Sequence, residues 1–169
     1  MEFMVREARP EDAAAMLRFA EALFAEPGLD LPTAPGEFHL TLAEEEGVIA
    51  AHAAAPNGVF LLAVSREGEI LGLLNCTGST RRALRHSCEM GISVARAVRG
   101  QGVGQALLTS MLDWARGAGV SRIELHVYAR NRGAMRLYRR FGFAEEGRRR
   151  QAIWQDGQYL DDIVMARLL

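Results

Sequence analysis

Three glycines stand at the start of a helix-like apolar pattern in the segment VRGQGVGQALL, residues 98–108. Gly100, Gly102 and Gly104 follow a strand-like segment, residues 85–94. A glycine-rich turn between a strand and a helix aims free backbone N–H groups at one point and lets an anion approach the main chain. The segment therefore predicts a phosphate-binding loop. The alternative is a glycine turn that only allows the helix to pack on a sheet.

Two well-known phosphate-binding motifs do not fit this loop. A Walker loop requires lysine directly after its last glycine, whereas Gly104 is followed by glutamine. The dinucleotide-binding motif GxGxxG requires a third glycine where this chain has Gln105 or Leu107. The pattern that remains is Arg99-x-x-Gly102-x-Gly104.

The order of the expected elements predicts an α/β (α+β) fold. Strands are expected near residues 4–8, 59–65, 69–77, 85–94, 122–127, 143–154 and 159–168. Helices are expected near residues 10–25, 38–54, 101–118 and 131–141. Gly91, inside one strand, predicts a bulge or a close backbone approach. We expect a single domain over residues 1–169, with a mixed, mostly antiparallel six- or seven-stranded sheet flanked by about four helices.

Composition narrows the class of protein. The apolar runs are too short to cross a bilayer and the sequence does not open like a signal peptide, so we expect a cytoplasmic protein without a membrane partner. Cys76 and Cys88 have no metal-binding spacing, and no metal is expected. No nucleic-acid partner is expected either.

The charge is divided along the chain, because residues 1–80 carry a net charge of −9 and residues 81–169 a net charge of +8. All 20 basic residues are arginine, which suits bidentate phosphate contacts. Ordinary solvated faces are the alternative explanation.

Two blocks of this sequence resemble the GNAT N-acetyltransferase superfamily. The loop matches the signature Q/R-x-x-G-x-G/A, and ELHVYARNRGAMRLYRRFGF, residues 124–143, is similar to the second conserved block. The segment VREARPEDAAAM resembles the first strand and helix, so the likeness covers nearly the whole chain. The resemblance implies the GNAT acyl-CoA N-acyltransferase fold, acetyl-CoA as co-substrate and direct acetyl transfer to a primary amine. Relatives are often dimers, so a homodimer is one option.

The resemblance also implies where acetyl-CoA binds. The pyrophosphate is expected on the loop residues Arg99, Gly100, Gln101, Gly102, Val103, Gly104 and Gln105. The pantetheine arm is expected to pair with the preceding strand at Ile92, Ser93 and Val94, like an added strand. Asn131, Met135 and Tyr138 fall on one helical stripe and are expected to face the same ligand. Asn131 is alternatively only a helix N-cap.

Two residues are expected to carry the chemistry. Tyr138, by the family pattern, is the general acid for the departing thiolate, with a core tyrosine as the alternative. Glu89 is the expected base, directly or through water, with a surface charge as the alternative. A nucleophilic pair of His86 and Cys88 has little support, because nothing else completes a triad. His126 is interpreted as a packing or surface residue.

The acceptor is less constrained than the cofactor. An acidic N-terminal half favours a cationic amine by electrostatic steering, such as a free amino acid, a polyamine or another small cationic amine. A protein N-terminus, as for ribosomal-protein acetyltransferases, is the alternative. A CoA-binding sensor without turnover, or an interaction module on the same fold, belongs to a different class.

Overall fold

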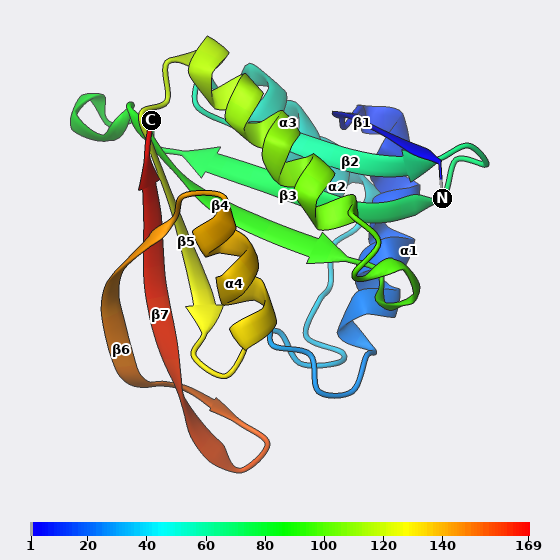
Figure 1. Cartoon of the computed structure of the whole chain (residues 1–169). Coiled ribbons are helices and arrows are strands. Elements are labelled where there is room, and N and C mark those ends of the chain that lie inside the picture. The colour runs from blue at the N-terminus through cyan, green and yellow to red at the C-terminus, as the bar shows by residue number, and fades with distance from the viewer. Residues whose placement is uncertain (1) are drawn as a thin grey trace.

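The computed structural model describes residues 2–169, which form seven strands and four α-helices (Figure 1). The strands are β1 (Phe3–Glu7), β2 (Val59–Ser65), β3 (Ile70–Gly78), β4 (Ser87–Val94), β5 (Arg122–Tyr128), β6 (Ala144–Gln155) and β7 (Gln158–Leu168). The helices are α1 (Ala13–Phe24), α2 (Leu42–Ala54), α3 (Val103–Ala118) and α4 (Arg132–Arg140). None of the helices among these residues is long and apolar enough to cross a membrane.

All seven strands join one sheet in the order β1-β2-β3-β4-β5-β7-β6. Every neighbouring pair is antiparallel except β4 and β5, which are parallel. The expected mixed, mostly antiparallel sheet is therefore confirmed. The parallel ladder is short, because it joins only residues 87–89 to residues 122–124. Beyond it the two strands diverge, and α4 lies in front of the opening (Figure 1).

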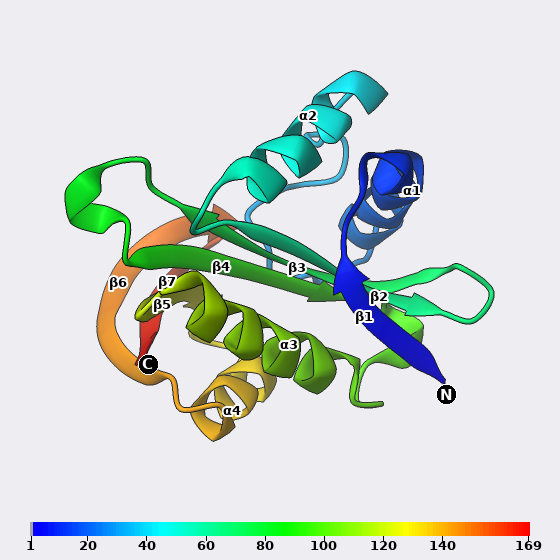
Figure 2. The same ribbon diagram turned by 90° about the horizontal axis from the view of Figure 1, so that it is seen from above.

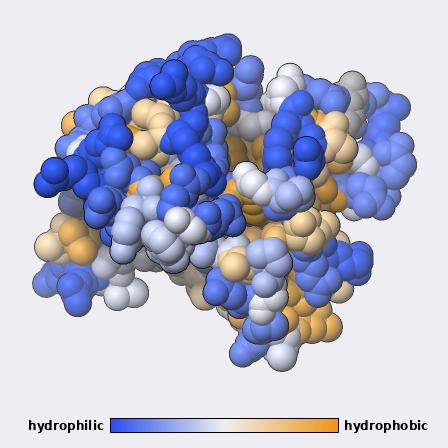
Figure 3. All heavy atoms as spheres, turned by 90° about the horizontal axis from the view of Figure 1, so that it is seen from below, coloured by the Kyte–Doolittle hydropathy of each residue, from blue (hydrophilic) through white to orange (hydrophobic). Residues whose placement is uncertain are grey.

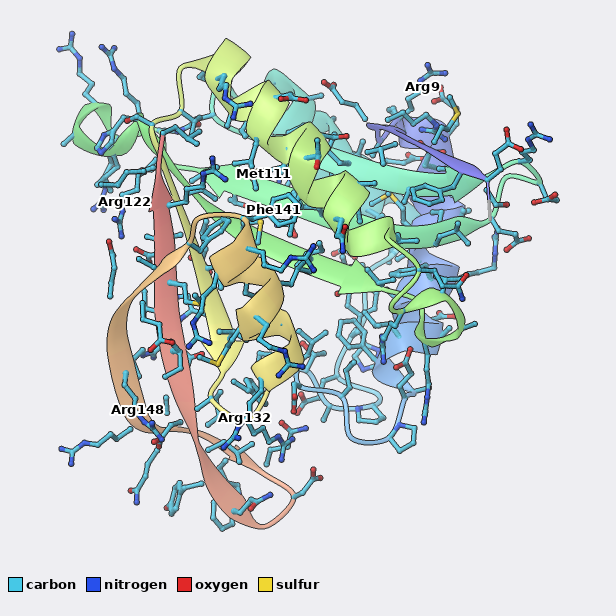
Figure 4. The ribbon with its side chains drawn as sticks, in the orientation of Figure 1. Arg9, Met111, Arg122, Arg132, Phe141 and Arg148 are labelled. Atoms are coloured by element: carbon cyan, nitrogen blue, oxygen red, sulfur yellow. The ribbon has the colours of Figure 1, made fainter. Side chains whose placement is uncertain are left out.

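The helices cover both faces of the sheet (Figure 2). Helices α1 and α2 lie on one face, and α3 and α4 lie on the other. The larger core cluster joins α3 and α4 to the sheet, and the fully buried Met111 points from α3 toward the strands (Figure 4). A smaller cluster, which includes Met16, Ile49 and Leu62, packs α1 and α2 on the opposite face. Side chains that alternate along β4 and β5 therefore meet different layers.

Two local expectations are wrong. The helix expected from residue 38 begins at Leu42, because the Glu44 N–H donates to Thr41 Oγ1 (3.3 Å) and the Thr41 N–H donates to the Glu44 carboxylate (2.8 Å). Of the two expectations for Gly91, a bulge or a close approach, the bulge is wrong, because β3 and β4 pair without interruption from Gly72 to Gly78. The glycine instead leaves room for Asn75, whose Oδ1 would lie 2.8 Å from an added Cβ.

Candidate active site

A cleft of about 730 Å³ lies where β4 and β5 diverge. Its walls come from β4 and the glycine loop, from α4, and from the segment between α1 and α2. Seen from below, apolar surface lies in a recess between mainly polar surfaces (Figure 3). Ten of the predicted site residues line the cleft: Ile92, Ser93, Val94, Arg99, Gly100, Gly102, Gly104, Gln105, Asn131 and Tyr138.

Four predicted site residues do not line this cleft. The side chains of Val103 and Met135 are buried in the larger core cluster, so only their backbone is available to a ligand. Gln101 is exposed, and its side-chain amide donates to the carbonyl of Ala97 (3.1 Å). Glu89 lies on the other face of the sheet, because its neighbours on β4 point into the α3 layer.

The glycine loop has the geometry that an anion site requires. Gly100 and Gly102 have φ angles of +78° and +90°, and no atom lies within 4 Å of a Cβ added to either. Glycine is therefore favoured there by the backbone conformation rather than by packing. The first helical hydrogen bond of α3 runs from the Ala106 N–H to the Gly102 carbonyl (3.0 Å). The N–H groups of residues 103–105 precede it and are free to bind an anion.

Arginines give this end of the cleft a positive charge. Arg99, Arg136 and Arg140 line it. The Arg99 guanidinium donates through Nε to the Val94 carbonyl (2.9 Å) and places Nη2 2.7 Å from Glu26 Oε2. Arg99 is thus held at the loop by groups on two sides of the cleft.

Tyr138 projects from α4 and is only 7 % exposed. Its ring packs against Phe143, with 6.0 Å between the centroids. Burial raises the pKa of Tyr138 to about 12, so the hydroxyl keeps its proton at neutral pH and is able to donate a hydrogen bond. Asn131 caps the same helix, since its Oδ1 accepts from the Ala134 N–H (3.1 Å), and it also lines the cleft.

A group of polar side chains on the other face was missed by the sequence analysis. His126 Nδ1 lies 2.7 Å from Asp162 Oδ2, and Arg149 Nη1 lies 3.2 Å from the same oxygen. His126 and Asp162 are 36 residues apart and meet only because β5 pairs with β7. The one signal in the sequence is an acidic residue directly before the apolar run of β7, residues 163–165.

The imagined pair of His86 and Cys88 is not formed. His86 is exposed before β4 begins, whereas Cys88 is buried beside Cys76. Both cysteines are free and belong to the larger core cluster. They are packing residues.

Comparison with known proteins decides the family. The sequence matches the model of the acetyltransferase (GNAT) family over residues 17–143. The chain belongs to the GNAT family. This GNAT chain is also similar over its whole length to the solved acetyltransferase of the GNAT family from Streptococcus pneumoniae, with a TM-score of 0.95 and 30% identity. That match covers 99% of this chain and 100% of the other.

Individual relatives of this GNAT enzyme act on different acceptors according to their names. L-amino acid N-acetyltransferase AaaT from Escherichia coli (strain K12) is 31% identical over 115 residues, which are 66% of this chain and 69% of that protein. The [Ribosomal protein uS5]-alanine N-acetyltransferase of the same strain is 29% identical over 101 residues, 59% of this chain and 52% of that protein.

One solved structure of the same fold contains the cofactor. A phosphinothricin acetyltransferase from Sinorhizobium meliloti was solved in complex with AcCoA, and it matches with a TM-score of 0.87 at 20% identity. The match covers 100% of this chain and 89% of that one. Family membership makes the protein an acetyl-CoA-dependent N-acetyltransferase.

Proposed function

We propose that this GNAT enzyme transfers the acetyl group of acetyl-CoA directly to the amine of a small molecule, with a free amino acid as the preferred acceptor class. The observation that carries the proposal is the fixed segment between α1 and α2, residues 25–41, at the wall of the cleft. Asp30 pairs with Arg130 (2.7 Å), and the Leu29 carbonyl accepts from the Gln155 side chain (3.1 Å). A segment held in place by these contacts leaves room for a small acceptor more readily than for a polypeptide.

The cleft fits the chemistry of acetyl-CoA. Free N–H groups at the start of α3, together with Arg136 and Arg140, suit the phosphates. The edge of β4 that faces the opening has no partner strand beyond Glu89, so the backbone of residues 90–94 can pair with the amides of a pantetheine arm. When bound, acetyl-CoA supplies an activated thioester; orientation and proton transfer fall to this chain.

Tyr138 is the proposed general acid. Acetyl transfer forms a bond between the amine nitrogen and the carbonyl carbon and breaks the bond from that carbon to sulfur. The buried hydroxyl of Tyr138 donates its proton to the sulfur that leaves. The amine must also lose a proton, and Glu89, exposed on the outer face of β4, is the base predicted from the sequence.

A screen of acceptors tests the proposal. Purified protein is incubated with acetyl-CoA and single amino acids, polyamines or peptides with free N-termini, and release of the CoA thiol is followed. We expect turnover with amino acids. Turnover only with peptides would favour a protein N-terminal acetyltransferase, and calorimetric binding of CoA without turnover would favour a sensor. A homodimer stays a prediction, which light scattering of the purified protein tests.

A further inference from the structure

His126 lies on β5 at the point where the two parallel strands separate. Glu89 and Glu124 form the last matched pair, so His126 lies two residues beyond the ladder, level with Gly91. Leu125 and Val127 are buried in the α3 layer, and alternation along β5 therefore places His126 on the opposite, outer face. The His126 imidazole and the Tyr138 hydroxyl thus approach the opening between β4 and β5 from opposite faces of the sheet.

The imidazole is oriented by a buried carboxylate. Asp162 on β7 is buried, and its Oδ2 lies 2.7 Å from His126 Nδ1. Because an ionised carboxylate only accepts hydrogen bonds, the short contact with Asp162 requires the hydrogen on Nδ1, which leaves the Nε2 lone pair free. The Glu124 Oε1 atom lies 3.8 Å from Nε2, too far for a hydrogen bond. The His126 side chain is 32% exposed.

Charged side chains on three strands lie close to this imidazole. The Glu124 carboxylate lies 3.8 Å from His126 Nε2, and the Asp162 carboxylate lies 2.7 Å from His126 Nδ1. Arg149 on β6 places its Nη1 3.2 Å from Asp162 Oδ2 and 3.4 Å from His126 Nδ1. Arg122 is bound to Glu124 (2.6 Å) and to Glu146 on β6 (2.6 Å), and so is engaged elsewhere.

We propose that His126, positioned by Asp162, is the general base that removes the proton from the acceptor amine. The inference rests on the proposed function and replaces Glu89 in that role. Nε2 takes a proton from the amine nitrogen as that nitrogen bonds to the acetyl carbon, and the positive imidazole is stabilised by Asp162. No hydrogen bond orients the Glu89 side chain within residues 2–169, whereas His126 has a fixed partner.

The experiment compares four variants with the wild-type enzyme, using the best amine from the screen. His126→Gln is expected to lower kcat/KM about 10²-fold near neutral pH, and its rate should keep rising with pH toward the pKa of the acceptor, about 8 for an α-amine. Asp162→Asn should lower the rate less, by about tenfold, because the ring loses its orienting partner. His86→Gln, just before β4 begins, is the matched control, and Glu89→Gln tests the base that the sequence predicts.

Three further measurements separate chemistry from folding. The acetyl-CoA affinity of His126→Gln, from calorimetry, should equal that of the wild type, and added imidazole should restore activity to His126→Gly. Nitrogen-15 NMR of the histidine rings should show the Nδ1–H tautomer for His126, and Asp162→Asn should reduce it. The inference would be overturned if His126→Gln kept the wild-type pH profile, or if Glu89→Gln were the one variant that lost it. If the wild type turned over none of the amines, the proposed function would be contradicted instead. The NMR measurement would still test the contact between His126 and Asp162.

Discussion

Substitution of Gly104 by valine tests whether the start of α3 is kept open for acetyl-CoA. Gly104 is the second residue of α3 and lines the cleft. A Cβ added there would lie 3.5 Å from Leu137 Cδ2 and 3.8 Å from Val94 Cγ2, which are ordinary contacts. Alanine therefore fits the folded protein. The two additional methyl groups of valine extend into the space that the cofactor needs.

The magnitude follows from the cost of overpacking. Extra methyl groups in a filled site cost about 1–3 kcal/mol, and a midpoint of about 2 kcal/mol corresponds to roughly 30-fold weaker binding. Gly104→Ala should cost less than about 1 kcal/mol. Gly117→Val is the matched control, because it lies near the end of the same helix with no atom within 4 Å of an added Cβ. Calorimetric titration with acetyl-CoA measures the effect, and thermal unfolding checks the fold. Unchanged affinity in a Gly104→Val protein with wild-type stability would refute the reasoning.

Three further predictions follow from individual contacts. Tyr138→Phe should lower kcat about 10²-fold with unchanged acetyl-CoA affinity, and an unchanged kcat would show that Tyr138 is a packing residue. Because burial raises the pKa of Tyr138 to about 12, ionisation of this hydroxyl should not lower wild-type activity below about pH 11. Glu26→Gln should tighten acetyl-CoA binding about two- to fivefold, because it frees Arg99 from a competing carboxylate; weaker binding in calorimetry would contradict this. Hydrogen bonds from Arg6 lower the pKa of Asp12 in the folded protein. The pair therefore stabilises the fold at pH values above the unfolded-state pKa of about 3.9, and this stabilisation is lost as the pH falls through the lower folded-state pKa. Asp12→Asn should therefore cost about 1–2 kcal/mol in urea unfolding at pH 7 and almost nothing at pH 2, and an equal cost at both pH values would exclude the mechanism.

Local signals predicted most of the fold, because each depends on residues close in the sequence. The Asp156-Gly157 turn has φ angles of +52° and +74°, as a tight hairpin requires, and the glycine loop leads into α3. The start of α2 at Leu42 could also have been predicted from the sequence, since Thr41 and Glu44 have the spacing of a capping box. The expectation of a bulge at Gly91 failed because the close neighbour is the side chain of Asn75 on another strand.

The residues of the candidate site likewise fall into those that local sequence signals predict and those that they do not. The loop and the stripe of α4 were predicted because one turn and one helix present them, although Met135 turned inward to the core. The contact between His126 and Asp162 could not be predicted, because it depends on the register of β5 with β7. That a residue of β5 lies beside the opening likewise follows only from where the parallel ladder ends.

The most direct test of the account is a crystal structure of the complex with acetyl-CoA. The account predicts the pyrophosphate within hydrogen-bond distance of the N–H groups of residues 103–105, and the pantetheine paired with the open edge of β4 at residues 90–94. The thioester sulfur should lie beside the Tyr138 hydroxyl, with His126 on the opposite side of the opening. Acetyl-CoA bound elsewhere, or a thioester remote from both side chains, would contradict the central claim.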